Sequence, residues 1–245
     1  MFLYKNNIFI MNGKSIVKIS YNRRPFAKTI DITHEKSLGA RYRNREFKND
    51  SIIIIEGEEI YIKYITVPRV KKNELEKIVK NELGFYYRTD EDIIFSYSIL
   101  KKNKINMDLA VFYINGNSLN NVDLKNINNI KYIYLIQFCY AKYVKNISSL
   151  NKYIITFIYK QNLYFIFCEN GLIKYNYIFR NFQEGNVEFE NCLNYFIDLN
   201  KDIADNLEMI YALGFAKETI KDINTSYCVK DLGNIEQNKL FKTVI

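Results

Sequence analysis

Short apolar runs separated by turn residues dominate the N-terminal part of the chain. Residues 8–11 and 15–21 predict two strands around a turn at 12–13, because Asn-Gly is a common dipeptide in tight hairpins. The β-branched runs 51–56 and 59–67 predict two more strands. The polar stretch 33–50 has few aliphatic residues and predicts a loop or a short helix.

The hydrophobic period changes from strand to helix after Pro68. Apolar residues then recur at the spacing of one helix face, at Leu75, Ile78, Val79, Leu83 and Tyr86. The segments 93–100 and 107–114 follow and predict a hairpin that packs on this helix. The local order is therefore β-α-β-β.

The second half of the chain alternates strands with helices. A strand and a short helix are expected at 131–137 and 139–146. A three-stranded meander is expected at 153–159, 163–168 and 172–179. It is followed by a helix at 189–196, a strand at 209–213, a helix at 216–223 and a strand at 227–229. This alternation indicates α/β layering.

Composition narrows the class of protein. The 245 residues are 48% hydrophobic and 25% charged, which is typical of a soluble globular protein. No apolar run reaches the roughly 18 residues of a membrane span, and the N-terminus does not resemble a signal peptide, so a cytoplasmic protein is expected. The net charge of +8 makes an anionic partner a candidate, either nucleic acid or the acidic face of a membrane, and composition does not choose between the two.

The sequence contains few candidate residues for catalysis or metal binding. Four scattered cysteines and one histidine, His34, are too few for a zinc site. No Gly-x-Ser-x-Gly elbow is present, and residues 90–92 are interpreted as a solvated acidic turn and not as a cation loop. Gly13-Lys14-Ser15 lacks the upstream glycine of a phosphate loop, so a hairpin turn is the better interpretation.

One basic segment leaves several interpretations open. Arg41, Arg43 and Arg45 alternate with Tyr42 and Asn44, a pattern used by surfaces that bind single-stranded nucleic acid. An exposed loop that carries part of the general basic excess is the stronger interpretation. Electrostatic attachment to an anionic membrane leaflet is a third one.

The segment from Tyr61 to Asn115 resembles the FtsA-like insert of PilM, an actin-like type IV pilus assembly protein, and the cytoplasmic region of GspL in type II secretion. The residues that carry the resemblance are Val67-Pro68, Glu74-Leu75, Val79, Glu82-Leu83, Asp90-Glu91-Asp92, Tyr97 and the strand 109–114. The resemblance implies an α/β, degenerate actin-like (ribonuclease H-like) fold with two lobes. The first lobe would comprise 1–56 and 116–150, the inserted β-α-β-β subdomain 57–115, and a shortened second lobe 151–245.

Departures from the actin-like pattern concern the two phosphate hairpins. Actin-like ATPases place glycines and an acidic residue there, because backbone amides hold the phosphates and a carboxylate positions Mg²⁺ and water. Here the first hairpin has no Asp and the second, 156–162, has no Gly. We therefore expect a pseudo-nucleotidase that needs no cofactor, with a vestigial nucleotide loop at Asn12, Gly13, Lys14, Ser15 and Gly214. An active ATP-binding protein that uses the same loop with Mg²⁺ is the alternative.

The resemblance also implies a function. The chain would be a scaffold at the inner face of the cell membrane that binds the N-terminal cytoplasmic tail of a PilN-like membrane protein and links it to the pilus assembly ATPase. A groove between the insert and the main sheet is the expected docking site. The candidate partner-binding residues are Arg69, Lys72, Leu75, Val79, Phe85 and Tyr86, of which Leu75 and Val79 fit the core of the insert better.

Overall fold

The computed structural model describes residues 6–12, 14–22, 30–39, 51–87, 93–116, 130–203, 207–221, 223 and 225–245. The chain divides into two compact units. The main unit comprises Met1–Glu58 and Asn121–Ile245, and the insert comprises Glu59–Asn120, where the sequence predicts an insert at 57–115. The basic segment 41–45 and the acidic turn 90–92 lie outside the described residues.

The first sheet of the main unit is built on buried β-branched strands. Its strands are β1 (Asn6–Met11), β2 (Ile16–Asn22), β3 (Asp31–Gly39), β4 (Ser51–Ile55) and β8 (Ile130–Leu135), in the order β3-β2-β1-β4-β8. The first three strands pair antiparallel, and β4 lies parallel to both β1 and β8. All five residues of β4 are buried, as expected for a parallel strand covered on both faces.

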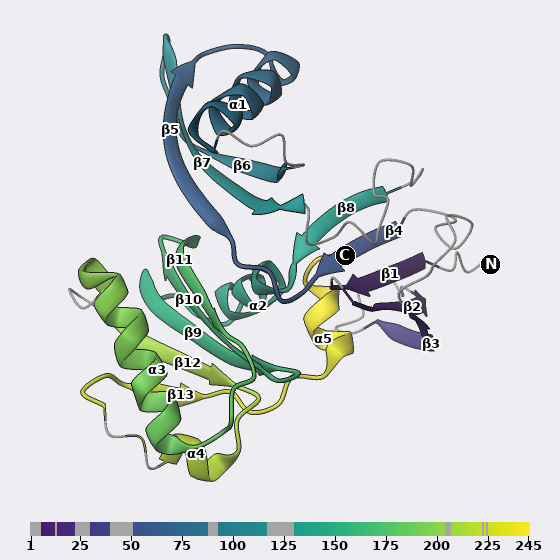
Figure 1. The fold of residues 1–245 in the computed structure, drawn as a ribbon, viewed down its shortest axis with the longest axis vertical. Coiled ribbons are helices and arrows are strands. Elements are labelled where there is room, and N and C mark those ends of the chain that lie inside the picture. The colour runs from purple at the N-terminus through teal and green to yellow at the C-terminus, as the bar shows by residue number, and fades with distance from the viewer. Residues whose placement is uncertain are drawn as a thin grey trace. The chain divides into compact units, whose positions relative to one another are not determined.

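The second sheet repeats this arrangement. Its strands are β9 (Lys152–Tyr159), β10 (Asn162–Glu169), β11 (Leu172–Phe179), β12 (Met209–Leu213) and β13 (Val229–Asp231), in the order β11-β10-β9-β12-β13. The meander β9-β10-β11 is again antiparallel, and β12 is parallel to β9 and β13. The two sheets have the same strand order, and each forms one lobe of the two-lobed α/β arrangement that the resemblance implies (Figure 1).

Helices cover these sheets through apolar stripes. The helical segments of the main unit are α2 (Ile136–Lys145), α3 (Asn186–Leu199), the 3-10 turn η4 (Lys201–Ile203), α4 (Lys217–Lys221) and α5 (Gln237–Lys242). Helix α3 buries Phe189, Cys192, Leu193 and Phe196, a spacing that places all four on one face. Helix α5 packs against α2, where the Thr243 hydroxyl donates to the Cys139 carbonyl oxygen at 3.4 Å.

The segment 33–50 corrects one expectation from the sequence. Residues 31–39 form strand β3 instead of a loop or short helix. Residues 32–37 are exposed on both faces of the strand, so no alternation of apolar and polar residues marks it. Backbone pairing with β2 holds the strand in place.

The insert has the predicted β-α-β-β order. Strands β5 (Tyr61–Pro68), β6 (Ile93–Lys102) and β7 (Asn106–Asn115) form an antiparallel sheet in the order β5-β7-β6, and α1 (Lys72–Tyr87) packs on one face. The core of the insert consists of Val67, Leu75, Val79, Leu83, Met107, Leu109, Val111 and Tyr113. Among the described residues, no helix is long and apolar enough to span a membrane.

Candidate functional site

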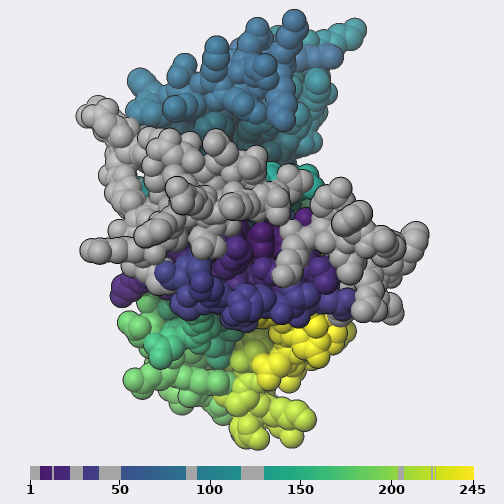
Figure 2. Space-filling view, turned by 90° about the vertical axis from the view of Figure 1, so that its right-hand side faces the viewer, coloured from purple at the N-terminus to yellow at the C-terminus, as the bar shows by residue number. Residues whose placement is uncertain are grey.

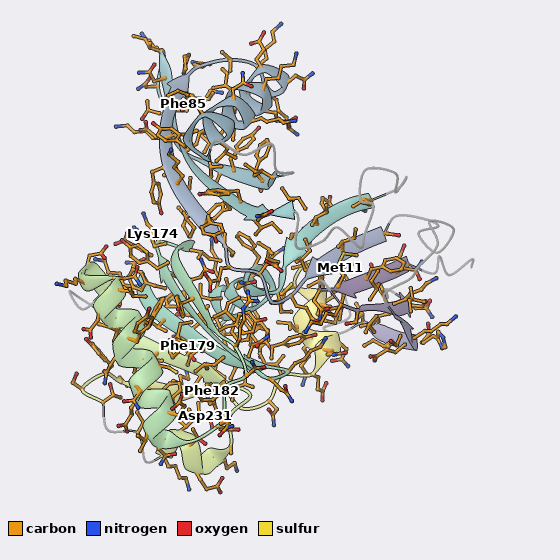
Figure 3. All side chains as sticks on the ribbon, viewed as in Figure 1. Met11, Phe85, Lys174, Phe179, Phe182 and Asp231 are labelled. Atoms are coloured by element: carbon orange, nitrogen blue, oxygen red, sulfur yellow. The ribbon has the colours of Figure 1, made fainter. Side chains whose placement is uncertain are left out.

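The turn between β1 and β2 is closed on itself by the side chain of Asn12. The Asn12 Oδ1 atom accepts hydrogen bonds from the backbone amides of Lys14 and Ser15, both at 2.8 Å, and from the Ser15 hydroxyl at 3.2 Å. The Asn12 amide in turn donates to the Ser15 carbonyl oxygen at 3.1 Å. The turn follows Met11, the last residue of β1, which is labelled in Figure 3. The amides that an actin-like ATPase would offer to a phosphate are therefore bound internally at Lys14 and Ser15.

Glu56 brings a buried carboxylate to this turn. It follows the buried strand β4, is 3% exposed, and its backbone amide donates to the Met11 carbonyl oxygen at 2.9 Å. The Asn12 Nδ2 group donates to Glu56 Oε1 at 2.7 Å. The second oxygen, Oε2, is buried and has no hydrogen-bond partner among the described residues. Glu56 is the one buried carboxylate in the part of the chain that the structure describes.

Lys160 reaches Glu56 from the other lobe. Its Nζ atom forms an ion pair with Glu56 Oε1, the oxygen that Asn12 also contacts. Lys160 lies in the turn between β9 and β10 with a φ of 57°, a left-handed conformation that costs a lysine about 1–2 kcal/mol. The two-residue turn between the paired residues Tyr159 and Asn162 requires a positive φ at its first position, so the turn itself accounts for this conformation. The β1–β2 turn and the β9–β10 turn are thus linked through Glu56, which accepts a hydrogen bond from Asn12 and forms an ion pair with Lys160.

Three further contacts hold the segment that follows Glu56. The Gly57 amide donates to the Tyr164 hydroxyl oxygen at 3.0 Å, and Arg180 Nη2 donates to the Gly57 carbonyl oxygen at 3.0 Å. Gln137 Nε2 donates to the Glu58 carbonyl oxygen at 2.6 Å. Because Tyr164 and Arg180 belong to the second lobe, they fasten the first lobe at the residue next to the ion pair.

Aromatic rings fill the space beside this polar cluster. The ring of Tyr140 on α2 stacks on Phe157 at 3.6 Å between centroids, and Phe157 stacks on Tyr164 at 4.6 Å. Burial raises the pKa of Tyr164 to about 12. Burial also raises the pKa of Tyr159 well above its usual value, and the Glu56 carboxylate adds to that effect. These phenols therefore stay protonated at neutral pH. The contacts between the lobes at this point are stacked aromatic rings beside an ion pair.

The residues predicted for a vestigial nucleotide loop fall in two places. Asn12, Lys14 and Ser15 lie together in the β1–β2 turn, and Gly13 lies outside the described residues. Gly214 follows β12 with a φ of +78°, and a Cβ atom there would lie 3.1 Å from the Ile158 carbonyl oxygen. A close approach to strand β9 therefore explains Gly214 without any nucleotide.

The residues predicted to bind a partner also divide. Leu75 and Val79 are 3% and 0% exposed in the core of the insert, which corrects their assignment to a binding surface. Arg69, Lys72, Phe85 and Tyr86 are exposed. Lys72 and Phe85 are separated by 13 residues of α1, or about 20 Å along the helix axis at 1.5 Å per residue. The structure therefore does not bring the basic and aromatic candidates together.

Phe85 and Tyr86 form an exposed aromatic pair near the end of α1. Their side chains are 79% and 56% exposed, and their rings meet edge to face at 5.6 Å. Figure 3 labels Phe85 on the insert. Lys63 on β5 lies with its Nζ atom over the ring of Tyr86. Exposed aromatic rings of this kind are frequent anchors of protein interfaces.

Sequence reasoning missed Glu56, Lys160, Tyr164 and Arg180. Glu56 carried a usable signal, because it is the polar residue that directly follows four isoleucines of a buried strand. The other three lie more than one hundred positions further along the chain, and their contacts depend on how the lobes pack. Among the described residues, no group of three or more His, Cys, Asp or Glu side chains is arranged to hold a metal ion.

Comparison with known sequences identifies no relative. No known family model matches the chain, and no curated protein matches it in sequence.

Solved structures are similar over almost the whole chain. A protein of unknown function with an actin-like ATPase fold from Bacteroides thetaiotaomicron is 15% identical, with a TM-score of 0.54 over 98% of this chain and 95% of that one. The PilM-PilN type IV pilus biogenesis complex gives 8% identity and a TM-score of 0.55 over 96% of this chain and 88% of the other. The cytoplasmic domain of EpsL, an inner membrane component of the type II secretion system of Vibrio cholerae, gives 8% identity and a TM-score of 0.59 over 98% and 94%.

These similarities establish the fold. The chain has a two-lobed, actin-like α/β fold, which confirms the fold class predicted from the sequence.

Proposed function

We propose that this chain is a scaffold of a pilus or secretion assembly platform that works without ATP hydrolysis. It would lie at the cytoplasmic face of the membrane and bind the cytoplasmic tail of a membrane protein similar to PilN. The fold supports this proposal, because two similar structures come from a type IV pilus biogenesis complex and from an inner membrane component of type II secretion. A link to the assembly ATPase of such a machine is part of the same proposal.

The observation that carries the proposal is the closed state of the former phosphate hairpins. The Lys14 and Ser15 amides donate to Asn12, and Lys160 is paired with Glu56. A phosphate could bind the Lys14 and Ser15 amides only by displacing the Asn12 side chain, and it could recruit Lys160 only by breaking the ion pair with Glu56. The protein can therefore hold its two lobes together without the ligand that joins them in an actin-like ATPase.

The aromatic pair on α1 supplies the anchors for the tail in this proposal. Phe85 and Tyr86 are large, apolar and exposed at one end of the helix. Hot spots of protein interfaces are rich in such rings, because a ring buries much apolar area at a small entropic cost. A tail peptide with apolar side chains would cover these rings.

A binding titration tests the proposal. The N-terminal tail peptide of a PilN-like membrane protein from the same organism is titrated into the full chain, into F85A/Y86A and into the control V187A/L199A. The control removes two apolar residues of α3 that are 72% and 52% exposed. We expect micromolar binding that F85A/Y86A weakens at least tenfold and the control leaves unchanged, since truncating a hot-spot residue costs about 2 kcal/mol or more. Equal binding by all three proteins, or no binding to the wild-type chain, would refute the proposed docking.

A further inference from the structure

Two turns of the insert meet at one end of its sheet. The Arg69 amide, just after β5, donates to the Ile105 carbonyl oxygen at 2.7 Å, and Arg69 Nη1 lies 3.5 Å from the Asn103 carbonyl oxygen. Figure 1 shows the end of β5 and the turn between β6 and β7 at this same end of the insert. We call the surface formed by residues 69–72 and 99–105 the basic tip.

Charge on the basic tip is strongly one-sided. Its six cations are all exposed: Arg69, Lys71, Lys72, Lys101, Lys102 and Lys104. Three carboxylates lie close to it. Glu74 Oε2 accepts from the Lys71 amide at 3.3 Å, and Asp108, which faces Lys101 across the strands, accepts from the Thr66 hydroxyl at 2.7 Å. The third is Glu76, four positions after Lys72 on the same face of α1. Six cations against three carboxylates leave an excess of three positive charges on this surface.

Apolar side chains stand among these cations. Ile105 is 76% exposed, and Ile99 and Leu100 are 48% and 40% exposed. The turn that carries Ile105 is fixed, because Asn103 Oδ1 accepts from the Ile105 amide at 2.9 Å and from the Asn106 amide at 2.6 Å. Ile105 is therefore exposed to solvent on an ordered turn that also carries Lys102 and Lys104.

The side chains of Lys71, Lys72 and Ile105 are not placed where they would stabilise the insert. Lys71 precedes α1 and Lys72 is its first residue, where the helix dipole disfavours cations. An isoleucine that is 76% exposed contributes little to the core. Blocks of like charge with projecting apolar residues are typical of proteins that attach to a membrane surface.

We propose that the basic tip docks this protein on the anionic phospholipids of a bilayer. The lysines face the headgroups, and Ile105 enters the interface below them. A bilayer fits both features together, because an anionic layer covers an apolar interior. Nucleic acid fits less well, because residues 69–72 and 99–105 contain no aromatic side chain on which a base could stack. This site is separate from the aromatic pair, about 20 Å away along α1.

Vesicle flotation with the full chain tests the proposal. Vesicles of phosphatidylcholine alone are compared with vesicles of phosphatidylcholine and phosphatidylglycerol in a two-to-one ratio. The variants are K101Q/K102Q/K104Q, I105S and the control K201Q/K217Q/K221Q, which removes three exposed lysines of the second lobe. Circular dichroism and thermal unfolding verify that each variant is folded.

We expect binding to the anionic vesicles only, and a decrease as salt is added. Because each cation near an anionic surface contributes about a fivefold factor, K101Q/K102Q/K104Q should lose roughly 100-fold in partitioning. The control should lose much less, and I105S about tenfold. Equal losses in the two triple variants, or no binding to anionic vesicles, would overturn the proposal. Tighter binding of an oligonucleotide or an acidic peptide through the same lysines would also overturn it.

The vesicle assay contains no tail peptide. Failure of membrane docking therefore leaves the proposed tail binding intact, and failure of tail binding leaves membrane docking intact.

Discussion

Removal of the Lys160 ammonium isolates the ion pair between the lobes. K160M replaces lysine by an unbranched, uncharged side chain that is one atom shorter, and it leaves the buried Glu56 carboxylate with Asn12 as its remaining partner. A hydrogen bond to a charged group contributes about 1.5–3 kcal/mol. The Lys160 side chain is 50% exposed, so water already screens part of the interaction. We therefore expect the free energy of unfolding to fall by about 1–2 kcal/mol.

Urea denaturation of four proteins measures this effect. The wild type, E56Q, K160M and E56Q/K160M form a double-mutant cycle, whose coupling energy reports the pair itself. K239M is the matched control, because Lys239 is similarly exposed at 51% but pairs with Glu236, which is 63% exposed, at 3.5 Å. This surface pair should contribute less than about 0.5 kcal/mol. If K160M is no less stable than K239M, or the cycle shows no coupling, the ion pair does not hold the lobes.

Three other measurements follow from the structure. G214A should destabilise the protein by about 2 kcal/mol, because of its positive φ and the 3.1 Å approach to the Ile158 carbonyl, whereas G84A in α1 should stabilise it by up to about 1 kcal/mol; equal effects in urea titrations would contradict this. A thiol reagent at neutral pH should label Cys228, the exposed cysteine, and leave the other three unlabelled until the chain unfolds, because they are buried and burial raises their pKa to about 11–12. The free energy of unfolding should be constant from neutral pH to about 9 and then decrease towards pH 12, because thiols and phenols such as Tyr164 lose their protons more easily in the unfolded chain. A rise in the free energy of unfolding over this range would contradict the raised pKa values of these buried groups.

Local patterns were sufficient for most of the fold. The four isoleucines of β4 and the meander that begins at β9 are apolar runs bounded by turns, and their burial matches that pattern. Strand β3 was missed because it is exposed on both faces, so its sequence shows no alternation of apolar and polar residues. Its place depends on backbone pairing, which leaves no mark in the side chains.

The candidate site was predicted in part. Asn12 was singled out because its turn is a local signal, and in the structure its side chain caps the turn and contacts Glu56. The partner of Glu56 is Lys160, which is 104 positions away, and no local pattern links the two. Leu75 and Val79 illustrate the opposite error, since the helical period that identified them is the period of residues that pack in a core.

Thermal unfolding with Mg-ATP tests the central claim, that the lobes are held together by protein groups in place of a nucleotide. We expect the midpoint of unfolding to be the same with and without millimolar Mg-ATP. A ligand that binds the native state at about 100 times its dissociation constant adds about 2.7 kcal/mol of stability, or roughly 5–10 °C for a chain of this size. A saturable rise of that size would contradict the claim and identify the chain as an ATP-binding protein.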